Sequence, residues 1–335
     1  MTSLALLLAA SVAAPPATPE PDLADCGSCH QQQQQQWEQS LHARSMTDPL
    51  YIAMREWARS DGGEKVASTC ESCHSVGVFG TARRTESVTC AACHQAFPSA
   101  PGPAGWTVVE FAPVLAAEVS DDAPHRVVAT DGMRSSGVCM ACHAELHNPH
   151  GVPLCTTGPE SERAEGGGDC TACHMPSESH RFPGTTPELL REAATLAVST
   201  LGREVEVMVI NSGAAHALPT GSALRQIRLE VVFMDGAGAE VARHTQVFAR
   251  VLEDAQGNAP APPWRARAVH RDTRLQYEEQ RSFRYTVAEG SASVSARLVY
   301  HRAPEAVARR LGVADHDFMA PVEMVAIDRQ LDGAS

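Results

Sequence analysis

The chain has 335 residues and a formal net charge of −13 at pH 7, and Lys65 is its only lysine. Phosphate binding requires a basic surface, so this acidic balance argues against nucleic acid as a partner. Aromatic residues make up only 5% of the chain, which is little for a sequence that must fill its own core. The length suits two domains.

The first segment, residues 1–14, predicts a cleavable secretory signal. An apolar stretch from Leu4 to Ala14 ends in small residues that suit cleavage, and a Pro-rich stretch follows. No Lys or Arg precedes the stretch, so a buried helix is the alternative. It is too short to span a bilayer, and no later segment is as long without charges. We therefore expect a periplasmic or otherwise exported protein with no transmembrane segment after signal removal.

Ten of the eleven cysteines fall in five C-x-x-C-H strings. The strings are Cys26-Gly-Ser-Cys29-His30, Cys70-Glu-Ser-Cys73-His74, Cys90-Ala-Ala-Cys93-His94, Cys139-Met-Ala-Cys142-His143 and Cys170-Thr-Ala-Cys173-His174. This pattern is the attachment site of c-type haem: two thiols bond to the porphyrin vinyl groups, and the next residue is the proximal iron ligand. We therefore expect five covalently bound haem c groups, which would also supply the apolar bodies that the scarce aromatics do not.

Zinc or disulfides are the alternative use of these cysteines. The pairs Cys70/Cys73 and Cys90/Cys93 have the spacing of a zinc ribbon. A ribbon needs only the four thiolates, however, and leaves His74 and His94 unexplained. The haem interpretation accounts for the histidine in all five strings, so we prefer it.

A low-spin haem iron takes a second axial ligand, and ten histidines remain to supply it. They are His42, His125, His147, His150, His180, His216, His244, His270, His301 and His316. A histidine that closely follows a motif lies on the proximal side and cannot easily reach the opposite face of the same haem. We therefore expect His180 to bind a neighbouring haem, and the same argument applies to His147 and His150.

The segments between the motifs are rich in Gly, Pro and Ser, which predicts short helices and loops wrapped around haems over residues 20–189. Residues 31–46, QQQQQQWEQSLHARSM, predict a helix that carries His42, with the six glutamines on a solvated face.

From residue 190 to residue 335 the pattern changes to alternating apolar and polar side chains without cysteine. Turns such as residues 235–238 and 253–258 separate the segments. We expect strands at 204–210, 226–234, 244–253, 282–289, 292–300 and 322–327. Residues 304–312 predict a short helix. Together these features predict an α+β chain in which an antiparallel, immunoglobulin-like β-sandwich follows the haem domain.

Several strings in order resemble the multihaem c-type cytochromes, in the group of the nitrifier tetrahaem cytochrome and hydroxylamine oxidoreductase. They are CGSCH followed by WEQSLHA, then APH, CHMPSESHRFPG and NSGAAHALPTGSALR. The resemblance implies haem packing of that group, a β-rich domain after the haems, and His42, His125, His180 and His216 as distal ligands. It leaves His147 and His150 open for the fifth, and it implies that Arg225 pairs with a haem propionate.

Sulfur side chains offer weaker candidates. Met175 adjoins His174 on the proximal face and suits a turn, whereas Met46 and Met133 stay open as axial ligands. Cys155 is the one cysteine outside the motifs. We expect a free thiol there, with an intermolecular disulfide as the alternative.

Bis-histidine irons have no open coordination position, so the histidine supply favours an electron carrier that exchanges electrons with redox partner proteins and has no catalytic residues. The alternative is an oxidoreductase that acts on nitrite or hydroxylamine at one open iron, which we would expect near His147 and His150. A third possibility is that the sandwich docks the cytochrome to a larger redox complex. The sequence does not fix the oligomeric state.

Overall fold

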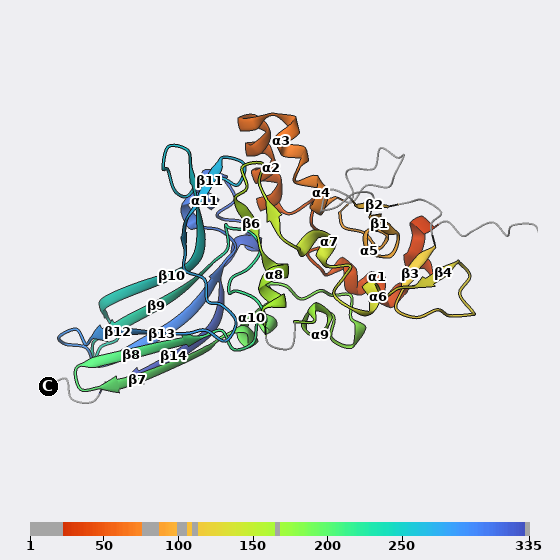
Figure 1. Cartoon of the computed structure of the whole chain (residues 1–335). Coiled ribbons are helices and arrows are strands. Elements are labelled where there is room, and N and C mark those ends of the chain that lie inside the picture. The colour runs from red at the N-terminus through yellow and green to blue at the C-terminus, as the bar shows by residue number, and fades with distance from the viewer. Residues whose placement is uncertain (1–22, 76–86, 99–105, 109–112, 165–167, 332–335) are drawn as a thin grey trace, which may run out of the picture.

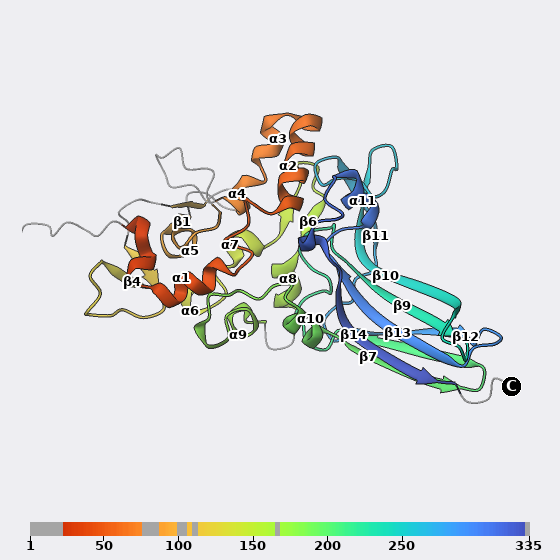
Figure 2. The same ribbon diagram turned by 180° about the vertical axis from the view of Figure 1, so that it is seen from behind.

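The computed structural model describes residues 23–75, 87–98, 106–108, 113–164 and 168–331. The predicted signal, residues 1–14, lies outside them. No helix among the described residues is long and apolar enough to cross a membrane. A helical half and a β-sheet half lie side by side, with α8, α10 and β6 between them (Figures 1 and 2).

The N-terminal half consists of short helices joined by loops and two-stranded ladders. The helices are η1 (Leu23–Ser28), α1 (Gln31–Glu38), α2 (Pro49–Gly62), α3 (Glu64–Ser68), α4 (Glu71–His74), α5 (Cys90–His94), α6 (Asp131–Arg134), α7 (Met140–His143), α8 (Thr157–Glu162), α9 (Cys170–His174), η3 (Pro176–Glu178) and α10 (Pro187–Ala193). The ladders pair β1 (Ala96–Pro98) with β2 (Trp106–Val108), β3 (Val114–Ala116) with β4 (Val127–Ala129), and β5 (Leu146–His147) with β6 (Pro153–Cys155).

The longest of these helices, α2, has clear sequence signals at both ends. Asp48 caps it by accepting hydrogen bonds from the backbone of Leu50 and Tyr51, and Pro49 occupies the first turn. Gly63 ends it with a φ of 80°, a backbone conformation that favours glycine. The motif helices are only one turn long, which is too short for stability in isolation. Their positions therefore depend on tertiary contacts.

The predicted helix over residues 31–46 is wrong in its second half. Helix α1 ends at Glu38, and residues 39–47 form successive turns. The buried hydroxyl of Ser40 accepts a hydrogen bond from the backbone of Ala43, and serine side chains that bond to nearby backbone favour turns over helix. His42 consequently lies in a turn.

The C-terminal half is a β-sandwich of two antiparallel sheets. The larger sheet has the order β11-β10-β9-β13-β14 and the smaller one the order β12-β8-β7. Their bounds are β7 (Thr195–Leu201), β8 (Glu204–Ile210), β9 (Gln226–Met234), β10 (Glu240–Asp254), β11 (Ala266–Asp272), β12 (Gln280–Thr286), β13 (Ser293–His301) and β14 (Val322–Gln330). Helices α11 (Glu305–Arg310) and η4 (Asp317–Met319) connect β13 to β14. The α+β class with a C-terminal sandwich is confirmed.

Alternating side chains of the central strands form the core between the two sheets. Val205, Val207 and Val209 of β8 are fully buried, as are Leu229 and Val231 of β9. These residues belong to one continuous apolar cluster, which holds the sheets face to face. The predicted boundary at residue 190 falls inside α10, five residues before the first strand begins at Thr195.

Candidate haem sites and their axial histidines

Four of the five motif histidines face a second histidine from a distant part of the chain. His30 faces His125 with ring centroids 6.3 Å apart, and His143 faces His42 at 6.3 Å. His94 faces His180 at 6.2 Å, and His174 faces His216 at 6.4 Å. The structure thus brings together each of the four distal histidines that the family resemblance implies with a different motif.

This spacing fits an iron between two imidazoles. A metal–nitrogen bond of about 2.0–2.1 Å, added to about 1.1 Å from Nε2 to the ring centre, gives roughly 6.2–6.4 Å between the centroids of two opposed rings. Directly packed rings elsewhere in the structure vary widely, from 4.3 Å between Tyr51 and His74 to 6.1 Å between Phe233 and His244, so the distinguishing feature of the four pairs is their uniform separation. The four separations agree with each other within 0.2 Å, although the pairs come from unrelated loops.

Hydrogen bonds at Nδ1 orient several of these rings. The Nδ1 of His94 lies 2.8 Å from the carbonyl oxygen of Leu115, and the Nδ1 of His174 lies 2.7 Å from that of Pro183. The Nδ1 of His216 lies 3.0 Å from the carbonyl oxygen of Ala217. An Nδ1–H that donates to a carbonyl leaves Nε2 as the basic nitrogen, which is the arrangement that metal-ligating histidines use.

Desolvation favours the neutral form of several of these imidazoles, which is the form that binds a metal. Burial lowers the pKa of His143 to about 4, with further lowering by His42 and Arg225. Burial also lowers the pKa values of His42, His94 and His216.

Two side chains near the turn of His42, Ser45 and Gln36, hold the backbone of two other histidines, His74 and His180. Ser45 donates a hydrogen bond from its hydroxyl to the carbonyl of His74 at 2.7 Å and accepts one from the backbone N–H of Val88 at 3.0 Å. Gln36 accepts the backbone N–H of His180 at 2.9 Å. The expectation that all six glutamines lie on a solvated face is therefore wrong for Gln36. Gln36 directly precedes Trp37, whose indole N–H donates to the carbonyl of Val88. This tryptophan is the signal in the sequence for the side of α1 that faces the protein.

His74 differs from the other four motif histidines. Its Nδ1 lies 3.2 Å from the carbonyl oxygen of Ser45, so the ring is oriented as the others are. Its close ring neighbour is the buried Tyr51, stacked at 4.3 Å with an angle of 20° between the planes. Within the described parts of the chain, no second histidine ring faces His74 at the spacing of the other pairs.

His147 and His150, the two candidates for the fifth distal ligand, are not brought opposite a motif histidine. His147 lies 3.6 Å from Glu145 with 41% of its side chain exposed, and His150 is exposed. Asn148 between them donates to the carbonyls of Pro263 and Ala266, at 2.9 Å each, and accepts the backbone N–H of His150. This asparagine fixes the loop on the sandwich and so holds both histidines away from the motifs.

The five motifs lie next to one another. Three pairs of thiols from different motifs lie close enough to shift each other's pKa: Cys26 with Cys90, Cys73 with Cys142, and Cys139 with Cys170. Cys93 lies close enough to influence Cys139 electrostatically, which connects the third motif to the fourth. Because the thiols mark the edges at which porphyrins are attached, all five haem sites form one connected group.

Two of the other histidines are placed away from these pairs, whereas Arg225 lies near enough to His143 and His216 to lower their pKa values. His270 pairs with Glu253, and His244 packs against Tyr285. The thiol of Cys155 lies 3.3 Å from the hydroxyl of Thr157, and its expected state as a free thiol stays a prediction. Arg225 donates to the carbonyl of Thr220 at 3.2 Å.

The donor set suits haem better than a bare metal ion. Among the residues that the structure describes, no three or more His, Cys, Asp or Glu side chains converge on a point that could hold a metal ion. The histidines instead occur in opposed pairs beside paired thiols, which is the donor arrangement of a bis-histidine haem c.

Comparison with known proteins agrees with this geometry. The family model described as "Cytochrome c554 and c-prime" matches residues 25–95, which include the first three motifs. The penta-heme cytochrome c552 from Thermochromatium tepidum has a TM-score of 0.76 at 24% identity, over 91% of this chain and 97% of that one. No curated protein matches the chain.

Two further structural likenesses are weak. MtrC from Shewanella baltica OS185 has a TM-score of 0.19 at 12% identity, over 78% of this chain and 45% of that one. A hypothetical protein from Pyrococcus horikoshii OT3 has a TM-score of 0.18 at 11% identity, over 42% and 88%. Neither carries an argument about the fold. The Thermochromatium structure shares its fold with this chain over nearly the whole length. The five motifs and the family-model match support a multihaem c-type cytochrome that carries five haem c groups.

Proposed function

We propose that this chain is an exported electron-transfer cytochrome with four bis-histidine haems and one further haem, at His74, that no histidine of the described residues faces from the opposite side. The observation that carries the proposal is the set of four histidine pairs with centroids 6.2–6.4 Å apart. His30, His94, His143 and His174 supply the proximal ligands of these irons, and His125, His180, His42 and His216 the distal ones. When bound, such haems change valence without opening a position for substrate.

The contiguity of the motifs supports transfer between haems. The thiol contacts join the first motif to the third, the second to the fourth, and the fourth to the fifth. Porphyrins attached at these positions would have neighbouring edges, so an electron can pass along the group without leaving the protein. We infer that the packing follows that of the nitrifier cytochrome group.

The carrier is preferred over an enzyme that acts on nitrite or hydroxylamine, because most irons here have two histidine ligands within reach. The family model and the matched structure also describe cytochromes. The remaining candidate for an open iron is at His74 and no longer near His147 and His150. The proposal also includes a signal at residues 1–14 that directs the chain to the periplasm, where the cytochrome exchanges electrons with redox partner proteins.

The test is electron paramagnetic resonance of the oxidised protein purified with its haems, combined with a haem count. We expect five haems per chain, of which four give low-spin ferric signals that cyanide does not change over minutes. The haem at His74 is expected to bind cyanide readily. High-spin signals from two or more irons would overturn the proposed ligation, and turnover of nitrite or hydroxylamine at a catalytic rate would overturn the carrier function.

A further inference from the structure

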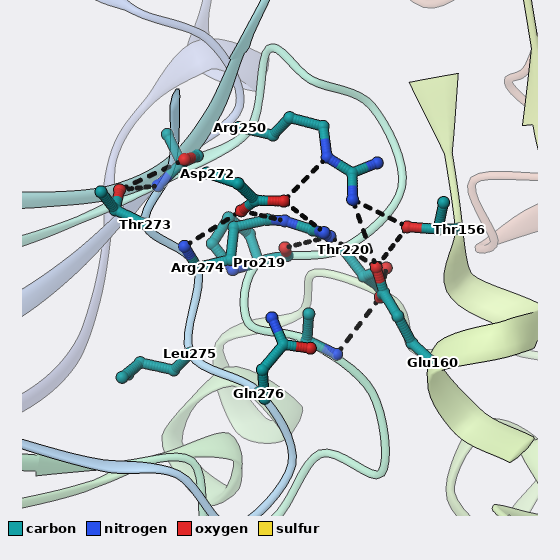
Figure 3. Close-up of polar contacts among 12 residues, drawn as sticks. Thr156, Glu160, Pro219, Thr220, Arg250, Asp272, Thr273, Arg274, Leu275 and Gln276 are labelled. Carbon is teal, nitrogen blue, oxygen red and sulfur yellow. Dashed lines mark hydrogen bonds and ion pairs between the residues drawn. The ribbon is translucent and has the colours of Figure 1, made fainter. Parts of the chain in front are cut away.

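A buried cluster of charged side chains lies where the sandwich meets the haem domain (Figure 3). Asp272, at the end of β11, lies between two arginines: it accepts two hydrogen bonds from Arg274, at 2.9 Å each, and one from Arg250 at 3.0 Å. Arg274 also donates to Glu160 of α8 at 2.8 Å. The side chain of Glu160 is only 3% exposed, so the cluster links the sandwich to α8 inside the protein.

Both carboxylate oxygens of Glu160 are used. Oε1 accepts from Arg274 and from the hydroxyl of Thr156. Oε2 accepts from the hydroxyl of Thr220 at 2.7 Å and from the backbone N–H of Ala217 at 3.2 Å. The arginines therefore bind one side of the carboxylate, and the loop that contains His216 binds the other (Figure 3).

The peptide group between His216 and Ala217 is held at both of its polar atoms. Its N–H donates to Glu160, and its carbonyl oxygen accepts from the side-chain amide of Asn211 at 2.8 Å. Asn211 is fully buried and also donates to the carbonyl of Gln276 at 3.1 Å. Because both ends of the peptide are fixed, the Cα of His216 has little freedom to move relative to α8.

Helix α8 also contacts the proximal side of the same haem site. The carbonyl of Ser161 accepts the backbone N–H of Gly168 at 3.1 Å. A Cβ at Gly168 would lie 2.9 Å from the Cβ of Ala215, so the segment that leads into α9 packs directly on the residue before His216. Asp169 then caps α9, the helix that ends in His174.

We propose that Glu160 is a positioning residue that holds His216 opposite His174 and so keeps the haem of the fifth motif, called the fifth haem from here on, six-coordinate. The inference rests on the proposed ligation of that haem. Buried ion pairs often contribute little to stability because desolvation offsets their attraction. Here Arg274 and its partner Asp272 keep the carboxylate of Glu160 charged and in place. That carboxylate then accepts hydrogen bonds from the loop of His216, so the β-sandwich holds a haem ligand in position.

The test compares Glu160→Gln with Glu162→Gln in the full chain purified with its haems. Glu162 lies on the same helix and is exposed, so it is the matched control. Glutamine keeps the volume of Glu160 but has one acceptor oxygen and loses the charge. His216→Ala provides the reference spectrum for loss of the ligand, and Thr220→Val removes one hydrogen bond to Glu160 if the glutamine variant fails to fold.

In Glu160→Gln, or in Thr220→Val as its substitute, we expect cyanide to replace the distal ligand of one haem about tenfold faster or more. The same haem should show a changed low-spin signal and a higher reduction potential, whereas Glu162→Gln should match the wild type. A lower melting temperature with unchanged spectrum, potential and cyanide rate would overturn the positioning role. If His216→Ala itself leaves all low-spin signals unchanged, the proposed ligation fails and the inference fails with it.

Discussion

The imidazole rings of His174 and His216 lie 6.4 Å apart, centroid to centroid, with only 13° between their planes. One ring follows a C-x-x-C motif in the helical half, and the other lies in a loop between β8 and β9 of the sandwich. An iron bound between them would join the two halves by coordination bonds. Under the proposed ligation, the sandwich is part of a haem site and not only an appended domain.

The distal histidines can be tested by removing them one at a time. We expect His42→Ala or His180→Ala to convert one of the low-spin haems to a high-spin form, because each removal leaves one iron with a single strong axial ligand. His150→Ala is the control, since His150 is exposed and faces no motif histidine. Paramagnetic resonance and the optical spectrum of the oxidised protein provide the measurement. A high-spin signal in the His150 variant would restore that residue as a ligand and contradict the pairing.

Gln36 offers a test within a run of identical residues. It accepts the backbone N–H of His180 at 2.9 Å, whereas Gln35 is exposed. We expect Gln36→Leu to lower the free energy of unfolding by about 1–2 kcal/mol, because the N–H of His180 loses its acceptor. The haem between His94 and His180 should also bind cyanide faster. Gln35→Leu should change neither quantity, and equal effects of the two substitutions would mean that the hydrogen bond is not important.

Gly213 lies close to the backbone of α10, three residues before His216. A Cβ at this position would fall on the carbonyl oxygen of Glu192, and the N–H of Gly213 donates to the carbonyl of Ala193 at 3.1 Å. We expect Gly213→Ala to lower the free energy of unfolding by about 1–3 kcal/mol, since the backbone must move to make room. Urea unfolding measures this change.

The control for Gly213 is Gly236→Ala, because a Cβ there meets nothing within 4 Å. The loop shift should also appear in the spectrum of the fifth haem, as the same segment carries His216. A Gly213 variant as stable as the Gly236 variant would show that the loop adapts without cost.

Much of the sandwich could be predicted from alternation alone. The strands over residues 204–210 and 226–234 are found at those bounds, because their inward side chains are buried while the outward ones are not. The strands β7 and β11 were missed. Both lie at sheet edges, and β11 is exposed along nearly its whole length, so no apolar alternation marks it in the sequence.

The haem sites also have a part that the sequence predicts and a part that it does not. The C-x-x-C-H motifs are local, so each proximal ligand can be identified from five adjacent residues. Distal pairing is not local: Gln36 of α1 holds His180, and Asn211 and Glu160 hold the loop of His216. His147 and His150 lie away from the motif histidines because Asn148 donates to the carbonyls of Pro263 and Ala266. These contacts span more than a hundred residues of the sequence, so no local pattern predicts them.

The buried carboxylate of Glu160 makes stability depend on pH. Burial alone would raise the pKa of Glu160, but hydrogen bonds from Thr156 and Thr220 and the guanidinium of Arg274 outweigh it, so the pKa lies below its usual 4.5. A carboxylate whose pKa is lowered by folding stabilises the protein above the unfolded-state pKa. That contribution is lost as the pH falls below about 4.5 toward the folded-state value.

We therefore expect the free energy of unfolding of the wild type to fall more steeply than that of Glu160→Gln as the pH is lowered from about 6 through 4.5. Other carboxylates with lowered pKa values, such as Asp272 and Asp169, contribute to both slopes, so the difference between the two proteins isolates Glu160. Glu162→Gln is the control and should follow the wild type. The measurement is urea unfolding over this pH range, monitored by fluorescence and by the haem absorbance. Parallel curves for wild type and Glu160→Gln would mean that Glu160 has the same proton affinity in the folded and unfolded chain, in contradiction to the hydrogen bonds described for it.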